Sequence, residues 1–196
     1  MNTEPSIPLA EFLRPKNVGD IIGQDHLLGD GQSLKVAITS GNLPSMILWG
    51  PPGVGKTTIA RVIANSTDAQ FISISAVLSG VKEIRESVEK AKFSLEQQNK
   101  KTILFIDEVH RFNKGQQDAF LPHIESGLIT FIGATTENPS FEVNTALLSR
   151  CQIYVLKILS IDELNTIIDK VINKFDKIKI DNKAKDIILT YANGDA

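Results

Sequence analysis

The sequence has one cysteine and no apolar run long enough to cross a membrane. Cys151 alone excludes an internal disulfide and a cysteine zinc cage, which fits a reducing cytosol. The longest apolar runs, such as 46–49 and 103–106, have the length of strands and are far too short to span a bilayer. The N-terminus lacks a basic start followed by an apolar stretch, so we expect no signal peptide. Secreted, membrane, fibrous and disulfide-scaffold classes are therefore not expected.

Neither sign of charge dominates the chain. Its 21 Lys and Arg residues and 23 Asp and Glu residues give a net charge of -2. No global positive field attracts nucleic acid or membrane, so any nucleic-acid contact must come from a local patch. Hydrophobic residues make up 42% and charged residues 22%, as in folded domains. A chain of 196 residues forms one large domain, or one domain and part of a second.

Short apolar runs alternate with helical patterns along most of the chain. The strand candidates are 46–49, 70–74, 102–106, 129–133 and 153–156. Helical patterns cover 57–65, 81–95 and 114–126. In the last of these, Asn113 and Gln116 form a capping-box pattern, and Pro122 should kink or shorten the helix. The alternation predicts an α/β fold with a parallel sheet covered by helices on both faces.

The pattern changes near residue 160. Ser160 and Glu163 form a second capping-box pattern, and an apolar helical stripe follows them. A further helix is indicated around 184–191, and the last part of the sequence contains no strand pattern. We therefore expect a nucleotide-binding α/β domain over 1–159 and an incomplete helical lid subdomain over 160–196.

A phosphate-binding motif lies between the first strand and the first of these helices. It matches G-x-x-x-x-G-K-[ST] and consists of Gly50, Pro51, Pro52, Gly53, Val54, Gly55, Lys56 and Thr57. Its glycines let backbone N–H groups turn inward around phosphate oxygens, and the helix N-terminus adds partial positive charge. Lys56 should reach the β- and γ-phosphates of ATP, and the Thr57 hydroxyl should coordinate Mg²⁺. A chance glycine-rich turn is the alternative, which the surrounding strand and helix disfavour.

Two acids end the third predicted strand. Asp107 and Glu108 lie at the carboxyl edge of a buried strand, where open α/β sheets bind ligands. Asp107 would hold Mg²⁺, directly or through water, and Glu108 would orient and deprotonate the attacking water. Taken alone, the pair fits an ordinary strand end equally well. Its position downstream of the phosphate-binding motif favours the catalytic interpretation.

Other polar residues give weaker signals. Thr135 and Thr136 end the fourth strand, where either hydroxyl could bond the γ-phosphate or the attacking water, but a plain strand end explains them as well. Arg150, taken alone, is most simply a surface residue. The three histidines share no metal-ligand spacing with Cys151. His110 follows the acid pair at the edge of the site and has no chemistry assigned to it.

Together these motifs resemble an AAA+ ATPase of the clamp-loader clade. The resemblance narrows to the RarA/MgsA family, which includes the eukaryotic Werner helicase-interacting protein, through the segments 13–16, 22–27, 107–118 and 133–141. The run Asp-Glu-Val-His-Arg-Phe-Asn-Lys is its most specific part. The resemblance covers nearly the whole chain, from about Leu9 to Ala196.

The resemblance implies roles for the motif residues. Gly50 to Thr57 would be the Walker A motif, Thr58 would also bind nucleotide, and Asp107 and Glu108 would be the Walker B pair. Thr136 takes the sensor-1 position. Arg150 takes the position of the arginine finger, which acts on ATP in a neighbouring subunit. The implied catalytic residues are Lys56, Asp107, Glu108, Thr136 and Arg150, with Thr57 and Asp107 as metal ligands.

Two further segments acquire expected roles in the same way. Ile21, Ile22 and Gly23 match the segment that lines the adenine in the family. Ser75 lies where relatives place a polar switch residue, often an asparagine, that restrains the Walker B glutamate. Serine is shorter than that residue, so the correspondence is loose.

The resemblance also implies an architecture and a setting. The sheet should have the order 5-1-4-3-2. The protein should be a DNA-dependent ATPase that uses ATP and Mg²⁺ in replication-fork maintenance, repair and recombination, in the cytoplasm and at the nucleoid if bacterial. Its expected partners are DNA, in the form of forks, single strands or duplex ends, and the single-stranded-DNA-binding protein. No membrane partner is expected.

The sequence departs from the family by stopping early. Gly194, Asp195 and Ala196 match the start of the sensor-2 helix, and family members continue into a complete lid and a C-terminal oligomerisation domain. We therefore expect a cut piece of a longer protein. The full-length protein should form homo-oligomers, whereas this piece should be monomeric or weakly associated.

Two alternative functions remain. One is a clamp-loader subunit or a Holliday-junction branch-migration motor. Loading of a sliding clamp together with partner subunits would support the clamp-loader alternative. The other is an ATP-gated scaffold that does not hydrolyse. The intact set of Lys56, Thr57, Asp107, Glu108 and Arg150 argues against a scaffold, because a scaffold has no chemical need for all five.

Overall fold

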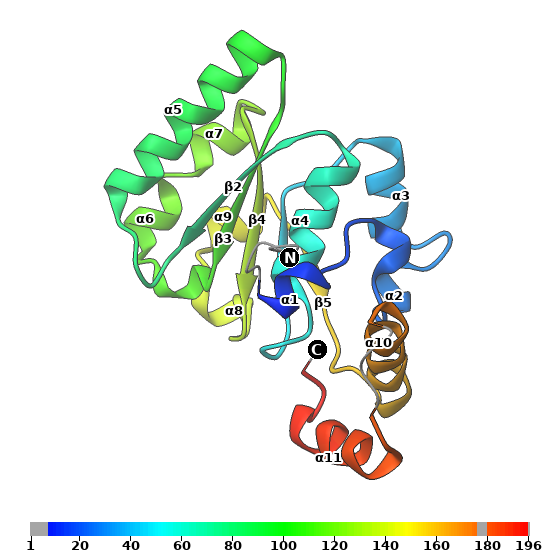
Figure 1. Cartoon of the computed structure of the whole chain (residues 1–196). Coiled ribbons are helices and arrows are strands. Elements are labelled where there is room, and N and C mark those ends of the chain that lie inside the picture. Colours follow the sequence, from blue (N-terminus) through cyan, green and yellow to red (C-terminus); the bar gives the residue numbers. More distant parts are fainter. Residues whose placement is uncertain (1–7, 176–179, 196) are drawn as a thin grey trace.

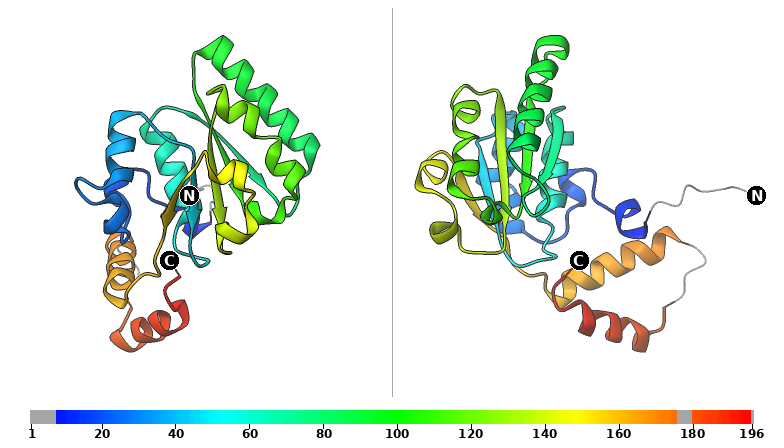
Figure 2. Two further views of the ribbon diagram at one scale, coloured as in Figure 1. Left: turned by 180° about the vertical axis from the view of Figure 1, so that it is seen from behind. Right: turned by 90° about the vertical axis from the view of Figure 1, so that its left-hand side faces the viewer.

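The computed structural model of the chain describes residues 8–175 and 180–195. Within them, five parallel strands form one sheet in the order β2-β3-β4-β1-β5, with helices on both faces (Figures 1 and 2). The strands are β1 (Met46–Trp49), β2 (Gln70–Ser75), β3 (Thr102–Asp107), β4 (Ile129–Thr135) and β5 (Gln152–Val155). Both the predicted α/β class and the predicted strand order are confirmed.

The carboxyl ends of three strands lie beyond the predicted limits. β2 and β3 end at Ser75 and Asp107, which pair with each other, and β4 ends at Thr135, which pairs with Trp49 of β1. The predicted ends had followed the apolar residues alone. Backbone pairing between parallel neighbours carries each ladder into the polar residues that follow, which places these residues directly at the sheet edge.

Helices precede the first strand, connect the strands and follow the last one. They are α1 (Leu9–Phe12), η1 (Val18–Asp20), α2 (Asp25–Leu28), α3 (Ser33–Ser40), α4 (Lys56–Ser66), α5 (Val81–Gln98), η2 (Val109–Arg111), α6 (Lys114–Asp118), α7 (Leu121–Glu125), α8 (Pro139–Glu142), α9 (Thr145–Leu148), α10 (Ile161–Lys174) and α11 (Asn182–Ala192), where η denotes a 3-10 helix. None of these described helices combines the length and apolarity needed to cross a membrane.

Alternate side chains of the strands form two separate cores. Leu48 points to one face of the sheet and packs in a cluster with Ile59 of α4. Ile47, its neighbour in sequence, belongs to the cluster on the other face with Ile84 of α5 and Phe120. Successive strand residues point to opposite faces, so apolar residues at every position allow helices to cover both. This explains why the central strands are apolar throughout.

The helix predicted over 114–126 is interrupted near its middle. Its start is as expected, because Gln116 N–H donates to Asn113 Oδ1 at 2.9 Å and Asn113 N–H donates to Gln116 Oε1 at 3.0 Å. The chain then forms two short helices, α6 and α7, and Pro122 lies in the first turn of the second. Proline lacks the N–H that a continuous helix needs and is tolerated only in a first turn. The predicted effect of Pro122 is confirmed.

Two helices, α10 and α11, follow the sheet. The capping box at the start of α10 is confirmed, since Ser160 N–H donates to Glu163 Oε2 at 2.6 Å and Glu163 N–H donates to Ser160 Oγ at 3.3 Å. The helices lie side by side at one end of the molecule, away from α5 (Figures 1 and 2). The division of the chain at residue 160 stays a prediction, and Ala196 lies outside the described residues.

A buried glutamine connects α6 to the segment before α9. Gln117 is 1% exposed, and its Nε2 donates to the carbonyl oxygens of Phe112 at 2.9 Å and Glu142 at 3.2 Å. Its Oε1 accepts from Asn144 N–H at 2.8 Å. One side chain thus satisfies three backbone groups of two segments that follow the strands β3 and β4.

We expect Gln117→Leu to lower the free energy of unfolding by about 1–3 kcal/mol or more, because the partly buried backbone groups lose their partner. Chemical denaturation measures this change. Gln97→Leu, at an exposed position of α5, is the control and should stay within about 0.5 kcal/mol of wild type. Equal stability of the two variants would contradict the role assigned to Gln117.

Candidate functional site

The sheet brings three predicted motifs to one edge. β1 leads into the loop that begins at Gly50, β3 ends at Asp107, and β4 ends at Thr135. β4 pairs with both β1 and β3, and all three strands run in parallel, so their carboxyl ends lie next to one another. The motifs that lie far apart in sequence therefore form one site, at the edge where open α/β sheets bind ligands.

The loop between β1 and α4 has the geometry of an anion cradle. Gly55 adopts φ 90° and caps α4 without a side-chain hydrogen bond, which leaves the first N–H groups of this 11-residue helix available to a ligand. At Gly50, a Cβ atom would lie 2.7 Å from the carbonyl oxygen of Leu156, so no larger residue fits between β1 and the chain after β5. Glycine is thus required at both places.

Lys56 is buried at the base of this loop. Its Nζ donates to the carbonyl oxygens of Gly50 at 2.8 Å and Pro51 at 2.7 Å, and the residue is 8% exposed. Burial lowers the pKa of the ammonium, whereas the negative charges of Glu108, Asp107 and Asp195 oppose that shift. Lys56 therefore lies within range of the acid pair, and phosphate oxygens could replace the loop carbonyls as its acceptors.

Asp107 is the last residue of β3, and Glu108 follows it with a left-handed backbone conformation. Burial raises the pKa of Asp107, and the charge of Glu108 adds to the rise, while Lys56 opposes it. Glu108 has φ 55° and ψ 50° at the start of η2, in the left-handed region that residues other than glycine rarely adopt. Such a conformation costs about 1–3 kcal/mol and is maintained only by its surroundings.

The two threonines at the end of β4 have different environments. Thr135 is fully buried; its hydroxyl donates to the Glu137 carbonyl oxygen at 3.2 Å and accepts from Glu137 N–H at 3.0 Å. Thr136 is partly exposed, and its hydroxyl donates to Glu108 Oε2 at 3.4 Å. Of the two, Thr136 is the residue that contacts the acid pair.

Two residues without an assigned role also reach the site. Nδ1 of His110 lies 2.9 Å from Thr135 Oγ1 and 3.2 Å from Glu108 Oε2. The carboxylate of Asp195 lies against Gly53, where an added Cβ would come within 1.9 Å of Oδ1. The position of His110 two residues after Glu108 is the one sequence signal for its contact. Sequence spacing gives no such signal for Asp195.

The segment proposed to line the adenine lies between the sheet and α10. Ile21 and Ile22 are half-buried, and at Gly23 a Cβ would come within 2.5 Å of Leu159 Cδ2. The side chain of the next residue, Gln24, forms two hydrogen bonds with the backbone of Lys157. Its Nε2 donates to the carbonyl oxygen at 2.7 Å, and its Oε1 accepts from the N–H at 3.0 Å. Contact with a base stays a prediction.

Thr57 and Thr58 belong to the first turn of α4. Both are half-buried, and Thr58 Oγ1 accepts from Arg14 Nη1 at 3.4 Å. Thr57 and Asp107 are the oxygen donors predicted for Mg²⁺, and among the described residues no group of three His, Cys, Asp or Glu side chains forms a site of its own. This donor set fits Mg²⁺, which typically uses one or two carboxylates together with substrate phosphates and water.

Arg150 is not brought to this site. It follows α9, is exposed, and its Nε donates to Glu125 Oε1 of α7 at 2.7 Å while Nη1 donates to the Ala146 carbonyl oxygen at 2.7 Å. Its Nη2 forms an ion pair with the same carboxylate. No hydrogen bond joins Arg150 to Lys56 or to Glu108 in the described parts of the chain.

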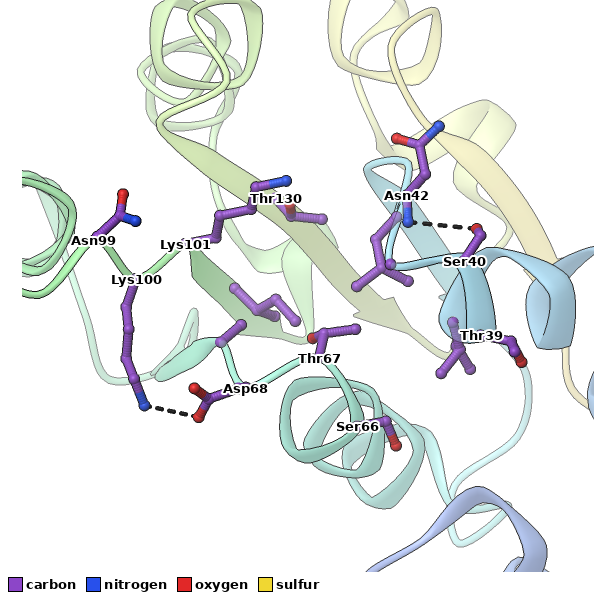
Figure 3. A pocket seen from close by; sticks show the side chains of 15 residues that line it. Thr39, Ser40, Asn42, Ser66, Thr67, Asp68, Asn99, Lys100, Lys101 and Thr130 are labelled. Carbon is purple, nitrogen blue, oxygen red and sulfur yellow. Dashed lines mark hydrogen bonds and ion pairs between the residues drawn. The ribbon is translucent and has the colours of Figure 1, made fainter.

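A polar hollow of about 470 Å³ lies at the opposite edge of the sheet (Figure 3). The loops after α3, α4 and α5 line it, and a 2.8 Å ion pair joins Lys100 to Asp68 at its side. It contains none of the predicted site residues and faces the amino ends of β3 and β4. The hollow is therefore separate from the candidate site.

The amino-acid sequence is similar to that of known proteins over nearly its whole length. The chain is 53% identical over 195 residues to replication-associated recombination protein A of Escherichia coli K12, covering 96% of this chain and 43% of that protein. It is 47% identical to the ATPase WRNIP1 of Dictyostelium discoideum, covering 96% of this chain and 22% of that protein. The chain thus spans less than half the length of these relatives. The resemblance to the RarA/MgsA family is confirmed.

The fold has a solved counterpart. The structure of the Thermotoga maritima RuvB Holliday junction branch migration motor has a TM-score of 0.75 and 31% sequence identity, covering 93% of this chain and 61% of that one. Residues 46–159, more than half of the chain, match the ATPase family associated with various cellular activities (AAA). This segment contains every motif of the site described above except the segment 21–23. The chain belongs to the AAA family of ATPases.

Proposed function

We propose that this chain binds and hydrolyses ATP with Mg²⁺ as the motor core of a DNA-dependent ATPase in replication-fork maintenance, DNA repair and recombination. The observation that carries the hydrolysis is the meeting of Lys56, the Asp107–Glu108 pair and Thr136 at one sheet edge. The names of the relatives support the setting.

The loop and α4 would bind the phosphates. The free N–H groups at the start of α4 donate to phosphate oxygens, and Lys56 exchanges the loop carbonyls for the β- and γ-phosphates. Thr57 and Asp107 would hold Mg²⁺, which would supply positive charge against the negative charge that develops on the phosphates. Thr58 and the segment Ile21 to Gly23 would contact the rest of the nucleotide.

Glu108 would act as the general base. Its carboxylate extends from the strand end beside Thr136, within the electrostatic range of Lys56. A water positioned between Glu108 and the γ-phosphate would transfer its proton to the carboxylate. Thr136, as sensor 1, would hold that water or the γ-phosphate, which its partly exposed hydroxyl supports.

Arg150 would act on ATP held by a neighbouring subunit. It is exposed, and its hydrogen bonds go to α7, to the preceding helix α9 and to the adjacent Ser149. An arginine in this position can reach a phosphate only across an interface, where the phosphate would compete with the carboxylate of Glu125. The full-length protein would therefore work as a homo-oligomer.

The DNA-related part of the proposal rests on the relatives. With a net charge of -2, the chain has no global attraction for DNA, so contact requires a local surface or further parts of the full-length assembly. Forks, single strands or duplex ends are the proposed substrates, with single-stranded-DNA-binding protein as a partner. The likeness to RuvB favours a branch-migration motor as the second candidate.

The helices α10 and α11 would form part of a lid over the nucleotide. They follow the sheet directly, and Leu159 and Glu163 at the start of α10 lie against Gly23 of the proposed adenine segment. This contact supports a lid over 160–196 that lies beside the nucleotide-binding domain over 1–159.

The first test concerns nucleotide binding. Lys56→Ala should weaken the affinity for ATP by roughly 10- to 150-fold, because a charge-assisted hydrogen bond contributes about 1.5–3 kcal/mol. Isothermal titration calorimetry measures the affinity. Lys101→Ala, at an exposed position far from the loop, should bind as wild type does. Equal affinity of all three proteins would refute the phosphate-binding role of the loop.

The second test measures ATP turnover by the full-length protein with fork, single-stranded and blunt-ended DNA side by side. We expect DNA to raise the turnover of wild type. Glu108→Gln should lower it by about 10²–10⁴-fold while keeping nucleotide affinity, since an amide cannot accept the proton of water.

Glu137→Gln, an exposed acid near the same edge, is the matched control and should keep wild-type turnover. Turnover by Glu108→Gln at more than half the wild-type rate would exclude Glu108 as the base. Turnover that no DNA changes would exclude DNA dependence.

The third test concerns Arg150. Removing an arginine finger lowers the rate about 10³–10⁵-fold, so Arg150→Ala should nearly abolish turnover by the full-length protein. The 196-residue chain alone should also hydrolyse ATP very slowly, because we expect it to be monomeric or weakly associated. Mixing Arg150→Ala subunits with Lys56→Ala subunits should restore part of the activity, because each supplies what the other lacks at a shared interface. Mixed assemblies without any activity would rule out action between subunits.

A further inference from the structure

The imidazole of His110 is placed directly beside the proposed base. His110 lies in η2, two residues after Glu108, and its side chain is 8% exposed. Its Nδ1 is 2.9 Å from Thr135 Oγ1 and 3.2 Å from Glu108 Oε2. One ring nitrogen thus faces both the end of β4 and the carboxylate that follows β3.

The acceptors around Nδ1 decide which nitrogen carries the hydrogen. An ionised carboxylate can only accept, so an unprotonated Nδ1 would place its lone pair against Glu108 Oε2. The Thr135 hydroxyl donates to the Glu137 carbonyl oxygen and is therefore free to accept from the ring. Nδ1 therefore carries the hydrogen and donates it to Thr135 Oγ1, and Glu108 Oε2 lies beside the same polar N–H at 3.2 Å.

The contact between His110 and Glu108 restrains a glutamate side chain that has few other polar partners. In the described parts of the chain, Thr136 provides the other contact of Glu108, a long hydrogen bond of 3.4 Å to the same Oε2. No described group donates to Oε1, which leaves that oxygen available to a water. His110 is itself fixed by Thr135, which is bonded to the backbone of Glu137. The position of the base thus depends on a rigid chain of contacts from β4.

We propose that His110 is the positioning residue for Glu108: its ring, fixed by the hydrogen bond to Thr135, keeps the polar Nδ1 edge 3.2 Å from Oε2 and so directs Oε1 toward the attacking water. The inference rests on the proposed role of Glu108 as base. Ser75, at the position the family resemblance indicates for a restraining residue, forms no side-chain hydrogen bond with Glu108 within the described residues. In this chain the restraint comes from His110 on the 3-10 turn.

The test compares variants of residue 110 in the full-length protein. His110→Leu removes the donor and should lower the single-turnover rate of ATP hydrolysis by roughly 10- to 100-fold, since a small misplacement of a catalytic group can cost about 10²-fold. Nucleotide affinity should change less than about threefold. His110→Asn, whose amide nitrogen occupies nearly the place of Nδ1, should recover most of the rate. Arg111→Leu, exposed on the same turn, is the control.

A double variant separates positioning from a general effect on the fold. In the Glu108→Gln background, His110→Leu should cause no further loss, because the group that it positions is already inactive. If His110→Leu unfolds, His110→Gln replaces it: this side chain is polar but places its N–H one bond farther out, so it should be slow where His110→Asn is fast.

The outcomes distinguish the two proposals. A wild-type rate for His110→Leu or for His110→Gln, equal rates for the Asn and Gln variants, or additive losses in the double variant would overturn the role of His110 and leave Glu108 as base. A wild-type protein that does not hydrolyse ATP, or Glu108→Gln at the wild-type rate, would instead refute the proposed function.

Discussion

The site depends on the parallel pairing of β4 with β1 on one side and β3 on the other. Trp49 pairs with Thr135, and Ile106 pairs with Gly133, so the residues after these strands meet at one edge. A shift of β4 by one residue would exchange its two faces and move Thr136 away from Glu108. The two apolar cores fix this register, because each strand buries alternate residues on opposite faces. Packing far from the chemistry thus determines its geometry.

Negatively charged side chains outnumber positively charged ones around Lys56. One ammonium, that of Lys56, lies within range of the carboxylates of Glu108, Asp107 and Asp195. Burial disfavours its charged form, and the three acids preserve it. A polyphosphate would add further negative charge to a site in which three carboxylates already surround the single ammonium of Lys56. A divalent cation bound together with the nucleotide would restore the balance, which favours Mg²⁺ as the proposed partner of ATP.

The fold was predictable because its signals are local, whereas several contacts of the site are not. Apolar strand runs, the cap at Ser160 and the break at Pro122 each act within a few residues. The structure confirms the five strands, the cap and the break, and extends three of the strand ends. The contact of His110 with Glu108 requires a left-handed backbone at Glu108, which glutamate rarely adopts and which only tertiary packing maintains. The carboxylate of Asp195 reaches Gly53 from the far end of the chain, and no spacing rule connects them.

The N-terminal segment links the phosphate loop to the helices that follow the sheet. Arg14 contacts Thr58 of α4, while the ring of Phe12 packs on Phe175 just beyond α10 and lies under the ammonium of Lys174. Between these contacts, the proposed adenine segment lies against Leu159, where Gly23 leaves no space for a side chain. A rotation of α10 relative to the sheet must therefore break these contacts or move the segment with it. That segment also precedes Gln24, whose side chain bonds the Lys157 backbone, so the proposed adenine segment, α4 and α10 are mechanically connected through one short stretch of chain.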